Sequence, residues 1–307
     1  MKLASMRVAL LAAVLALVAA ACGGDEETPP ADGGASAGGG DSVCASYDTG
    51  AGDLLARICE DGRIRVSTDP AYPPQSELNP KTGEYEGFDI DVAKAIADRL
   101  LGCSDCIDWE TPKWGVLTAG SWNDRWDMSV GSMTPTNERQ EVLNFTEPYS
   151  FVPAVVVVPE DANVSDVTTD LDGKTIGVCA DCTYQFFLEK SLAIRGFDFD
   201  FVIDDATVQG YDTDTTALQD LALGRLDAVM TSVTTAQAFI DEGNPVKIAG
   251  DSLFGEPLAV AFDKDTELDN TTLVDEVDQI VNDMHEDGTL TELSEKWYDG
   301  IDVTQVS

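Results

Sequence analysis

The chain has 307 residues and a formal net charge of −39, from 57 acidic and 18 basic side chains. A charge this negative repels nucleic acids and anionic membranes, which argues against both as partners. The sequence holds a single histidine and has no P-loop, G-x-S-x-G or H-E-x-x-H motif, which argues against the enzyme classes that depend on them.

The first 21 residues have the pattern of an export signal. Two basic residues precede the apolar run Val8–Ala21, which at 14 residues is shorter than the roughly 20 that a membrane span needs. The run ends in AAACGG, which resembles a bacterial lipobox with Ala19 in place of the usual leucine. We therefore expect removal of residues 1–21 and lipidation of Cys22, which would anchor the protein outside the cytoplasm. Ordinary cleavage after an A-x-A site is the alternative.

Residues 22–42 contain almost no bulky apolar side chain and are rich in Gly, Ala, Pro, Asp and Glu. Such a segment cannot bury enough surface to fold, so we expect a flexible tether between the lipid and a globular body. The body begins near Val43 and is long enough for a sizeable core in two lobes.

The first part of the body alternates strands and a helix. Apolar residues at helical spacing predict a helix over Phe88–Leu101. The run at 151–158 is almost continuously β-branched, which is typical of a buried strand. Further strands are expected at 63–67, 107–110 and 126–130.

The alternation then starts again. Strands are predicted at 174–178, 199–203, 227–231, 246–249 and 257–262, and helices at 183–192, 215–223, 234–241, 272–286 and 290–298. Strands that alternate with helices predict parallel-rich α/β sheets. Two such runs, with a late apolar strand to carry the chain back, predict two lobes joined by two crossing strands. We expect lobe 1 to hold residues 43–151 and 258–307, and lobe 2 to hold residues 152–257.

The cysteines fit an exported protein. Without Cys22, six of the seven remain, an even number as expected for disulfides in an oxidising compartment. Several pairings are open, and the local one joins Cys44–Cys59, Cys103–Cys106 and Cys179–Cys182. Zinc binding or a redox role of the two C-x-x-C pairs are the alternatives.

Four segments carry a resemblance to a known family. They are RVSTDPAYPP (65–74), GEYEGFDIDVAKAIA (83–97), GSMTPTNER (131–139) with NFTEPY (144–149), and GRLDAV (224–229). In this order they resemble the extracellular solute-binding proteins, family 3, which serve polar amino acid ABC importers. The resemblance covers nearly all of residues 60–300.

The resemblance implies a two-lobed, periplasmic-binding-protein-like fold of type II. It implies capture of a small zwitterionic solute, above all an amino acid, and its delivery to the membrane subunits of an ABC importer. It further implies a monomer that acts without cofactor, metal or catalysis.

The resemblance also assigns the ligand site. The family's arginine at Arg139 binds the ligand carboxylate, and a guanidinium suits this role because it binds carboxylate in a bidentate fork. Cys182 and Thr183 open a predicted helix, whose free N–H groups attract an anion, although Thr183 could serve only as an N-cap. Tyr72 and Trp114 match positions where the family places rings over and under the ligand. A family loop that meets the ligand with backbone and hydroxyl groups matches Gly131, Ser132, Met133 and Thr134.

One position departs from the family pattern. The family usually places an aspartate after the 224–229 segment to bind the ligand's amino group, but Ser232 stands there. A hydroxyl supplies no negative charge, so the partner must be Asp69, which matches an acidic family position, or another acid such as Asp181 or Asp212. Otherwise the ligand is not a plain α-amino acid. A non-amino-acid zwitterion such as an ectoine-like osmolyte, and a dehydratase-like cleft enzyme, remain as alternatives.

Overall fold

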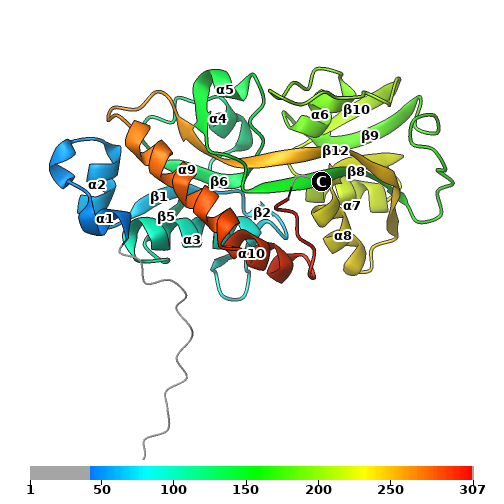
Figure 1. The fold of residues 1–307 in the computed structure, drawn as a ribbon. Coiled ribbons are helices and arrows are strands. Elements are labelled where there is room, and N and C mark those ends of the chain that lie inside the picture. The colour runs from blue at the N-terminus through cyan, green and yellow to red at the C-terminus, as the bar shows by residue number, and fades with distance from the viewer. Residues whose placement is uncertain (1–41, 306–307) are drawn as a thin grey trace, which may run out of the picture. The chain divides into compact units, whose positions relative to one another are not determined.

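One mixed β-sheet runs through residues 42–305, the part of the chain that the computed structural model describes (Figure 1). The predicted export signal (1–21), Cys22 and all but the last residue of the predicted tether lie outside the described residues. The described residues belong to one compact unit. Among them, no helix has the length and apolar character needed to cross a membrane.

Within residues 42–305 the sheet has nine strands in the order β10-β9-β11-β8-β12-β6-β1-β5, with β7 also paired to β12. Neighbours of β1 and β9 are parallel, whereas β8 and β12 run antiparallel to their neighbours. The α/β class predicted from the sequence is confirmed. The strands are β1 (Ile64–Ser67), β5 (Ile107–Glu110), β6 (Met128–Met133), β7 (Leu143–Phe145), β8 (Ser150–Pro159), β9 (Lys174–Cys179), β10 (Ala206–Tyr211), β11 (Ala228–Ser232) and β12 (Val246–Asp263).

Strands β8 and β12 join the two ends of the sheet. They pair with each other along residues 150–159 and 246–258, and β12 then continues beside β6 and β7. Two strands were predicted here, at 246–249 and 257–262, but the structure has one strand with a register shift between Ala249 and Phe254. Gly250 lies in this irregularity with φ 69°, a left-handed value that favours glycine. The irregularity interrupts the apolar pattern, so the sequence suggested two separate strands.

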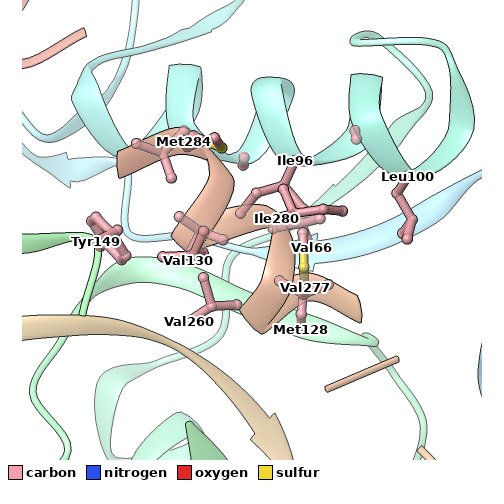
Figure 2. Close-up of a cluster of buried hydrophobic side chains, with 14 of the residues drawn as sticks. Val66, Ile96, Leu100, Met128, Val130, Tyr149, Val260, Val277, Ile280 and Met284 are labelled. Carbon is pink, nitrogen blue, oxygen red and sulfur yellow. The ribbon is translucent and has the colours of Figure 1, made fainter. Parts of the chain in front are cut away.

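The buried apolar side chains form several clusters along the sheet, and we use lobe 1 as a name for residues 43–151 and 258–305 and lobe 2 as a name for residues 152–257. In lobe 1, helices α3 (Phe88–Leu101) and α9 (Thr271–Glu286) pack against the strands (Figure 2). Helix α3 has the predicted bounds and ends at Gly102, in the left-handed conformation of a C-terminal cap. The side chains of this core include Val66, Ile96, Leu100, Met128, Val130, Val260, Val277, Ile280 and Met284.

Lobe 2 has a core on each face of its sheet. Val155 and Val157 of β8 face one cluster, whereas Val156 and Val158 face the other. Successive residues of a strand point to opposite faces, so a strand buried on both sides needs a continuous apolar run. The predicted buried strand at 151–158 is confirmed.

The strand predicted at 199–203 is wrong. These residues have no regular structure, and the strand beside β9 is β10. Phe199 and Phe201 alternate with aspartates as in a strand, but they instead join an aromatic cluster with Phe187 and Phe254. The edge strand is β10, in which apolar and polar residues are mixed. Its sequence, ATVQGY, gives no clear sign of a strand.

All five helices predicted after residue 158 are present, namely α9 and four of the helices that remain. The remaining helices are α1 (Val43–Ser46), α2 (Leu54–Asp61), α4 (Trp114–Thr118), α5 (Arg139–Val142), α6 (Thr183–Leu188), α7 (Asp214–Ala222), α8 (Val233–Asp241) and α10 (Thr289–Trp297). Helix α6 ends four residues before its predicted end, because Lys190 adopts a left-handed φ of 59°. A small hairpin of β2 (Ala71–Tyr72), β3 (Ser76–Leu78) and β4 (Tyr85–Glu86) follows β1.

Six cysteines form disulfides, each between partners close in the sequence: Cys44–Cys59, Cys103–Cys106 and Cys179–Cys182. Across the described residues, no group of three or more His, Cys, Asp or Glu side chains could hold a metal ion. The bridge Cys179–Cys182 is the one at the cavity described next.

Candidate functional site

A cavity open to solvent is lined by residues of both lobes. Its walls come from the ends of β6 and β9, from the loops that follow β1, β9 and β10, from β2 and the crossing strand β12, and from the starts of α4, α5, α6 and α7. The lining residues are Asp69, Ala71, Tyr72, Trp114, Gly131, Ser132, Arg139, Cys179, Ala180, Cys182, Thr183, Tyr184, Asp212, Thr213, Asp214 and Glu256.

Arg139 at the start of α5 is the one basic residue in this lining. Its side chain is 4% exposed, and its two terminal nitrogens donate to backbone carbonyls, Nη1 to Thr134 and Nη2 to Asp181, each at 3.0 Å. The guanidinium lies over the ring of Trp114, 4.9 Å from its centre. None of the ion pairs found among residues 42–305 includes it.

Burial lowers the pKa of Arg139 to about 10, and the nearby charge of Glu256 partly opposes this shift. The group is therefore still charged at neutral pH. A buried guanidinium without an ion-pair partner is costly unless an anion joins it. The site thus favours a negatively charged group at this end of the cavity.

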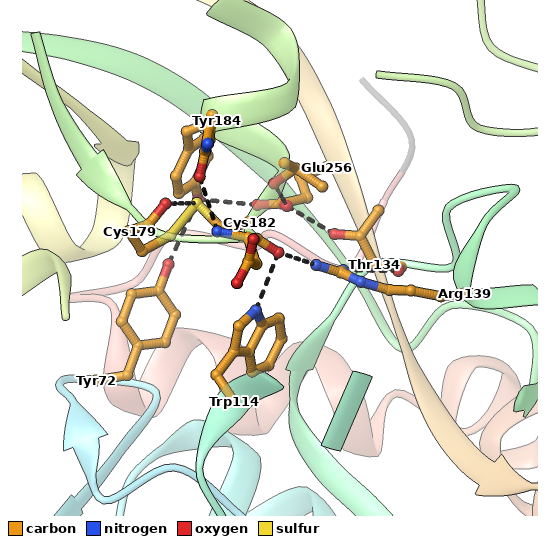
Figure 3. The surroundings of a disulfide bond; sticks show 11 residues. Tyr72, Trp114, Thr134, Arg139, Cys179, Cys182, Tyr184 and Glu256 are labelled. Atoms are coloured by element: carbon orange, nitrogen blue, oxygen red, sulfur yellow. Dashed lines mark hydrogen bonds between the residues drawn. A yellow bond between two sulfur atoms is a disulfide. The ribbon is translucent and has the colours of Figure 1, made fainter. Parts of the chain in front are cut away.

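The loop closed by Cys179–Cys182 faces Arg139 from lobe 2 (Figure 3). Within it, Asp181 has a left-handed φ of 59°. Its carbonyl oxygen accepts hydrogen bonds from Arg139 and from Trp114 Nε1, the latter at 3.1 Å. One backbone carbonyl in lobe 2 therefore joins two side chains of lobe 1 at the cavity wall.

Glu256 on β12 lies at the centre of a hydroxyl cluster and is 6% exposed. Its Oε1 accepts from the hydroxyls of Thr134 and Thr183, and its Oε2 accepts from Tyr184 at 2.8 Å. The cluster therefore ties both lobes to the strand that crosses between them. Sequence reasoning missed Glu256, although a charged residue directly before the apolar run 257–262 was a usable signal.

Asp89 of α3 is fully buried and is bonded to Ser132 of the cavity lining. Its two oxygens accept from the hydroxyls of Ser132 at 2.7 Å and Tyr149 at 2.9 Å. The amide of Ser132, which has φ 53°, donates to Tyr149 at 3.1 Å. Both polar groups that Ser132 was expected to offer a ligand are thus bonded within lobe 1, where they hold the end of β6 in place.

Asp89 gives a testable pH dependence. Burial raises its pKa to about 7, although the hydrogen bonds from Ser132 and Tyr149 oppose the shift. Because the unfolded chain loses this proton near pH 4, the native state holds one more proton between about pH 4 and 7. The stability that this group contributes is therefore largest at acid pH and is lost as the pH rises to 7.

Between pH 5 and 7.5 we expect Asp89 to reduce the free energy of unfolding by about 2–3 kcal/mol. Urea titrations at several pH values should show a shallower pH dependence for Asp89→Asn than for the wild type. The comparison cancels the contribution of the protein's other acids. Superimposable profiles would show that Asp89 ionises normally.

Two further carboxyl groups line the cavity with few partners. Asp69 in lobe 1 accepts a hydrogen bond from the amide of Ala71 at 3.0 Å, and burial raises its pKa. Asp214, the first residue of α7, is 4% exposed, and its Oδ1 has no hydrogen-bond partner among the described residues. Burial raises the pKa of Asp214 to about 7; the nearby Thr231 hydroxyl opposes this shift, and the charges of Glu256 and Asp69 add to it.

The structure brings together most of the residues expected at the site. Asp69, Tyr72, Trp114, Gly131, Ser132, Arg139, Cys182 and Thr183 all line the cavity. Met133 instead packs in the lobe 1 core, and Thr134 lies behind the wall, where it binds Glu256 and Arg139. Of the alternative acids, Asp212 lines the cavity, whereas Asp181 is absent from its lining.

Ser232 also lies outside the lining. Its hydroxyl caps α8 by accepting from the amide of Thr235 at 3.1 Å, and it accepts from Gln75 Nε2 at 3.2 Å. It is therefore committed to a buried polar contact between the lobes.

Sequence reasoning missed Tyr184 and Asp214 at the cavity. Asp214 follows directly after Thr213, an N-cap residue, and this was the signal that could have placed it at a helix start.

The sequence profile of the bacterial extracellular solute-binding proteins, family 3, matches residues 64–300. The L-cystine-binding protein TcyJ of Escherichia coli (strain K12) is 29% identical over 82% of this chain and 88% of its own length. The L-arginine-binding protein of Pseudomonas aeruginosa is 31% identical over 70% of this chain and 81% of its own.

A solved structure shares the fold. The ancestral amino acid-binding protein AncCDT-1, a precursor of cyclohexadienyl dehydratase, superposes with a TM-score of 0.66 at 26% identity and covers 80% of this chain and 99% of its own. The sequence match, the relatives and the fold agree with the cleft geometry, and this chain belongs to the bacterial extracellular solute-binding proteins of family 3.

Proposed function

We propose that the protein captures a small zwitterionic solute, an amino acid, outside the cytoplasm and delivers it to an ABC importer. The single observation that carries this proposal is the charged, buried guanidinium of Arg139, which lines a cavity between two lobes without an ion-pair partner among the described residues. A ligand carboxylate supplies that partner. The amino acid ligands named for the relatives support the same class.

Capture would couple to closure of the two lobes. We propose that lobe 1 and lobe 2 move as units about β8 and β12, the two strands that pass between them. The contacts that a closed cleft makes include Trp114 with Asp181 and the hydroxyls of Tyr72 and Tyr184 at 3.4 Å. A ligand held by groups from both lobes favours the closed form because it gains contacts that the open form lacks.

The aromatic walls suit such a ligand. Tyr72 and Trp114 both line the cavity, and one face of Trp114 is already covered by Arg139. Rings exclude water and strengthen the charge interactions within the cleft. They also accept an aliphatic or cationic side chain.

Binding, rather than catalysis, is the role we propose. The relatives named above are binding proteins, although AncCDT-1 is described as the precursor of a dehydratase. The retained solute therefore distinguishes the two roles. For a binding protein, mass spectrometry of material released from the purified protein would reveal an intact amino acid. For an enzyme, a carboxylate added to the protein would be converted to product.

The direct test is calorimetric titration with the standard L-amino acids, L-cystine and ectoine. We expect at least one amino acid to bind with micromolar affinity or better. Binding of ectoine alone would indicate an osmolyte carrier instead, and binding of none of these compounds would reject the proposal.

We propose further that Cys22 carries the lipid anchor and that the protein is a monomer. The mass of the membrane-extracted chain and its light scattering test these two points.

The disulfide at the cavity should matter for affinity. In Cys179→Ser/Cys182→Ser, the carbonyl of Asp181 loses the covalent loop that holds it towards Arg139 and Trp114. We expect amino acid binding to weaken about tenfold, because the loop must be ordered on binding. The matched control is Cys103→Ser/Cys106→Ser, a C-x-x-C bridge outside the cavity lining. Equal losses in both variants would trace the effect to general instability.

A further inference from the structure

The family pattern leaves this chain without its usual partner for a ligand ammonium, since residue 232 is serine. The structure removes the position itself from the site: the Ser232 hydroxyl is bonded to Gln75 and Thr235 and lies outside the cavity lining. An acid elsewhere on the wall must therefore supply the negative charge. The lining has four candidates, Asp69, Asp212, Asp214 and Glu256.

Glu256 and Asp212 fit this role poorly. Glu256 already accepts three hydroxyl hydrogen bonds, two of them from lobe 2. Asp212 is exposed, so water satisfies its carboxylate and weakens any charge interaction. Neither group has unmet bonding capacity inside the cleft.

Asp214 differs from both. Its side chain is at least nine-tenths buried, it lines the cavity, and its Oδ1 has no partner among the hydrogen bonds of residues 42–305. Buried polar atoms are rarely left unbonded, and an orphaned buried carboxyl oxygen costs free energy. A cationic donor that enters the cavity would remove this cost.

The surroundings of Asp214 make a cation the fitting donor. The ionisable groups that face it are Asp69 from lobe 1, Glu256 from β12, and the hydroxyls of Tyr72 and Tyr184. The Thr231 hydroxyl of β11, which has no hydrogen-bond partner of its own among residues 42–305, is close enough to oppose the rise in the pKa of Asp214, but it carries no charge. None of these is basic, and among the described ion pairs none involves Asp214.

We propose that Asp214 receives the ligand's ammonium group, with Asp69 opposite it on lobe 1, and so replaces the acid that the family places at position 232. This inference rests on the proposed function. The site then holds an amino acid by both charged ends, its carboxylate at Arg139 and its ammonium at Asp214. Neutral and basic amino acids with a free amino group fit, whereas N-acylated and acidic ones do not.

The arrangement links binding to protonation. Burial and the neighbouring acids keep the Asp214 carboxyl protonated in a fraction of the ligand-free molecules near pH 7, but an ammonium partner favours the carboxylate. Binding at pH 6 should therefore release a proton, and affinity should rise between pH 6 and 8. Asp69 and Glu256 face the same cavity, so the assignment to Asp214 requires a variant.

The test compares the wild type with Asp214→Asn in calorimetric titrations. The probe is the standard amino acid that binds the wild type most tightly, together with its N-acetyl derivative. We expect Asp214→Asn to bind this probe about 100-fold more weakly, because the amide leaves the ammonium without a counter-charge. Its proton release at pH 6, measured in two buffers of different ionisation enthalpy, should disappear. The N-acetyl derivative should not bind the wild type.

The control is Asp220→Asn, on the same helix but outside the cavity lining, where Asp220 pairs with Arg225 at the surface. It should change affinity less than threefold. Ligand-free Asp214→Asn should melt no lower than the wild type, since it replaces a buried carboxyl whose Oδ1 has no hydrogen-bond partner among residues 42–305 by an uncharged amide; a lower melting temperature would assign Asp214 a structural role and overturn the proposal.

The outcomes separate the two proposals. If no amino acid binds the wild type, the proposed function fails and this inference falls with it. If an amino acid binds and Arg139 is required, but Asp214→Asn binds it as the wild type does, only the role of Asp214 is overturned. Equal binding of the N-acetyl derivative would do the same.

Discussion

Replacement of Arg139 by alanine is expected to weaken amino acid binding by about 100-fold or more. The side chain is buried, charged and free of an ion-pair partner in the described part of the chain, so a ligand carboxylate is its natural counter-ion. Loss of one member of a buried charge pair costs about 3–5 kcal/mol. The measurement is calorimetric titration with whichever standard amino acid binds the wild type best.

Two companion variants make this result specific. Arg125 also stacks on a tryptophan, Trp126, with the guanidinium 4.7 Å from the ring centre, but it lies outside the cavity lining. Arg125→Ala should bind as the wild type does. Arg139→Lys keeps the charge but loses the bidentate fork, so we expect an intermediate affinity. Unchanged binding by Arg139→Ala would place the carboxylate elsewhere and remove the basis of the proposed function.

The second large effect is expected from Glu256→Ala. The carboxylate accepts hydrogen bonds from Thr134, Thr183 and Tyr184, which come from both lobes. Its removal leaves three buried hydroxyls without their acceptor. Because the surrounding walls are polar, they will not close around the space that the carboxylate leaves. We expect the free energy of unfolding to fall by about 3 kcal/mol, as measured by urea denaturation.

Glu256→Gln separates the two possible origins of this loss. The amide oxygen can still accept hydroxyl hydrogen bonds, so this variant should lose only about 1 kcal/mol. If charge rather than hydrogen bonding stabilises the cluster, Glu256→Gln and Glu256→Ala will be equally unstable. A Glu256→Ala protein as stable as the wild type would show that water replaces the carboxylate at no cost.

Much of this architecture could be predicted from local patterns. The bounds of α3 follow from apolar spacing and the glycine at its end, and β8 follows from consecutive valines that must face both cores. Predictions failed where a local pattern had more than one tertiary solution. The alternating Phe199 and Phe201 fit a strand, but aromatic packing on Phe187 and Phe254 buries them without one.

At the candidate site too, some features could be predicted from the sequence and others could not. Motifs of known family pattern located Arg139, Tyr72 and Ser132, because each lies in one of the contiguous segments that carry the resemblance, and the family's aromatic walls pointed to Trp114. The direction of each polar group was beyond such patterns. Ser132 directs its amide and hydroxyl to Tyr149 and Asp89, a choice that depends on a buried acid 43 residues earlier in the chain.

The sequence by itself determined the α/β class, the order of most strands and helices, the family, and the arginine at the cavity. These depend on short-range periodicity and on residues adjacent in the chain. Only the tertiary structure decided that Glu256 joins the two lobes, that Ser232 is bonded to Gln75 and Thr235 outside the cavity lining, and that Asp214 lines the cavity with one oxygen that has no hydrogen-bond partner among the described residues. Burial and hydrogen-bond satisfaction arise when segments far apart in sequence meet, and no local pattern records them.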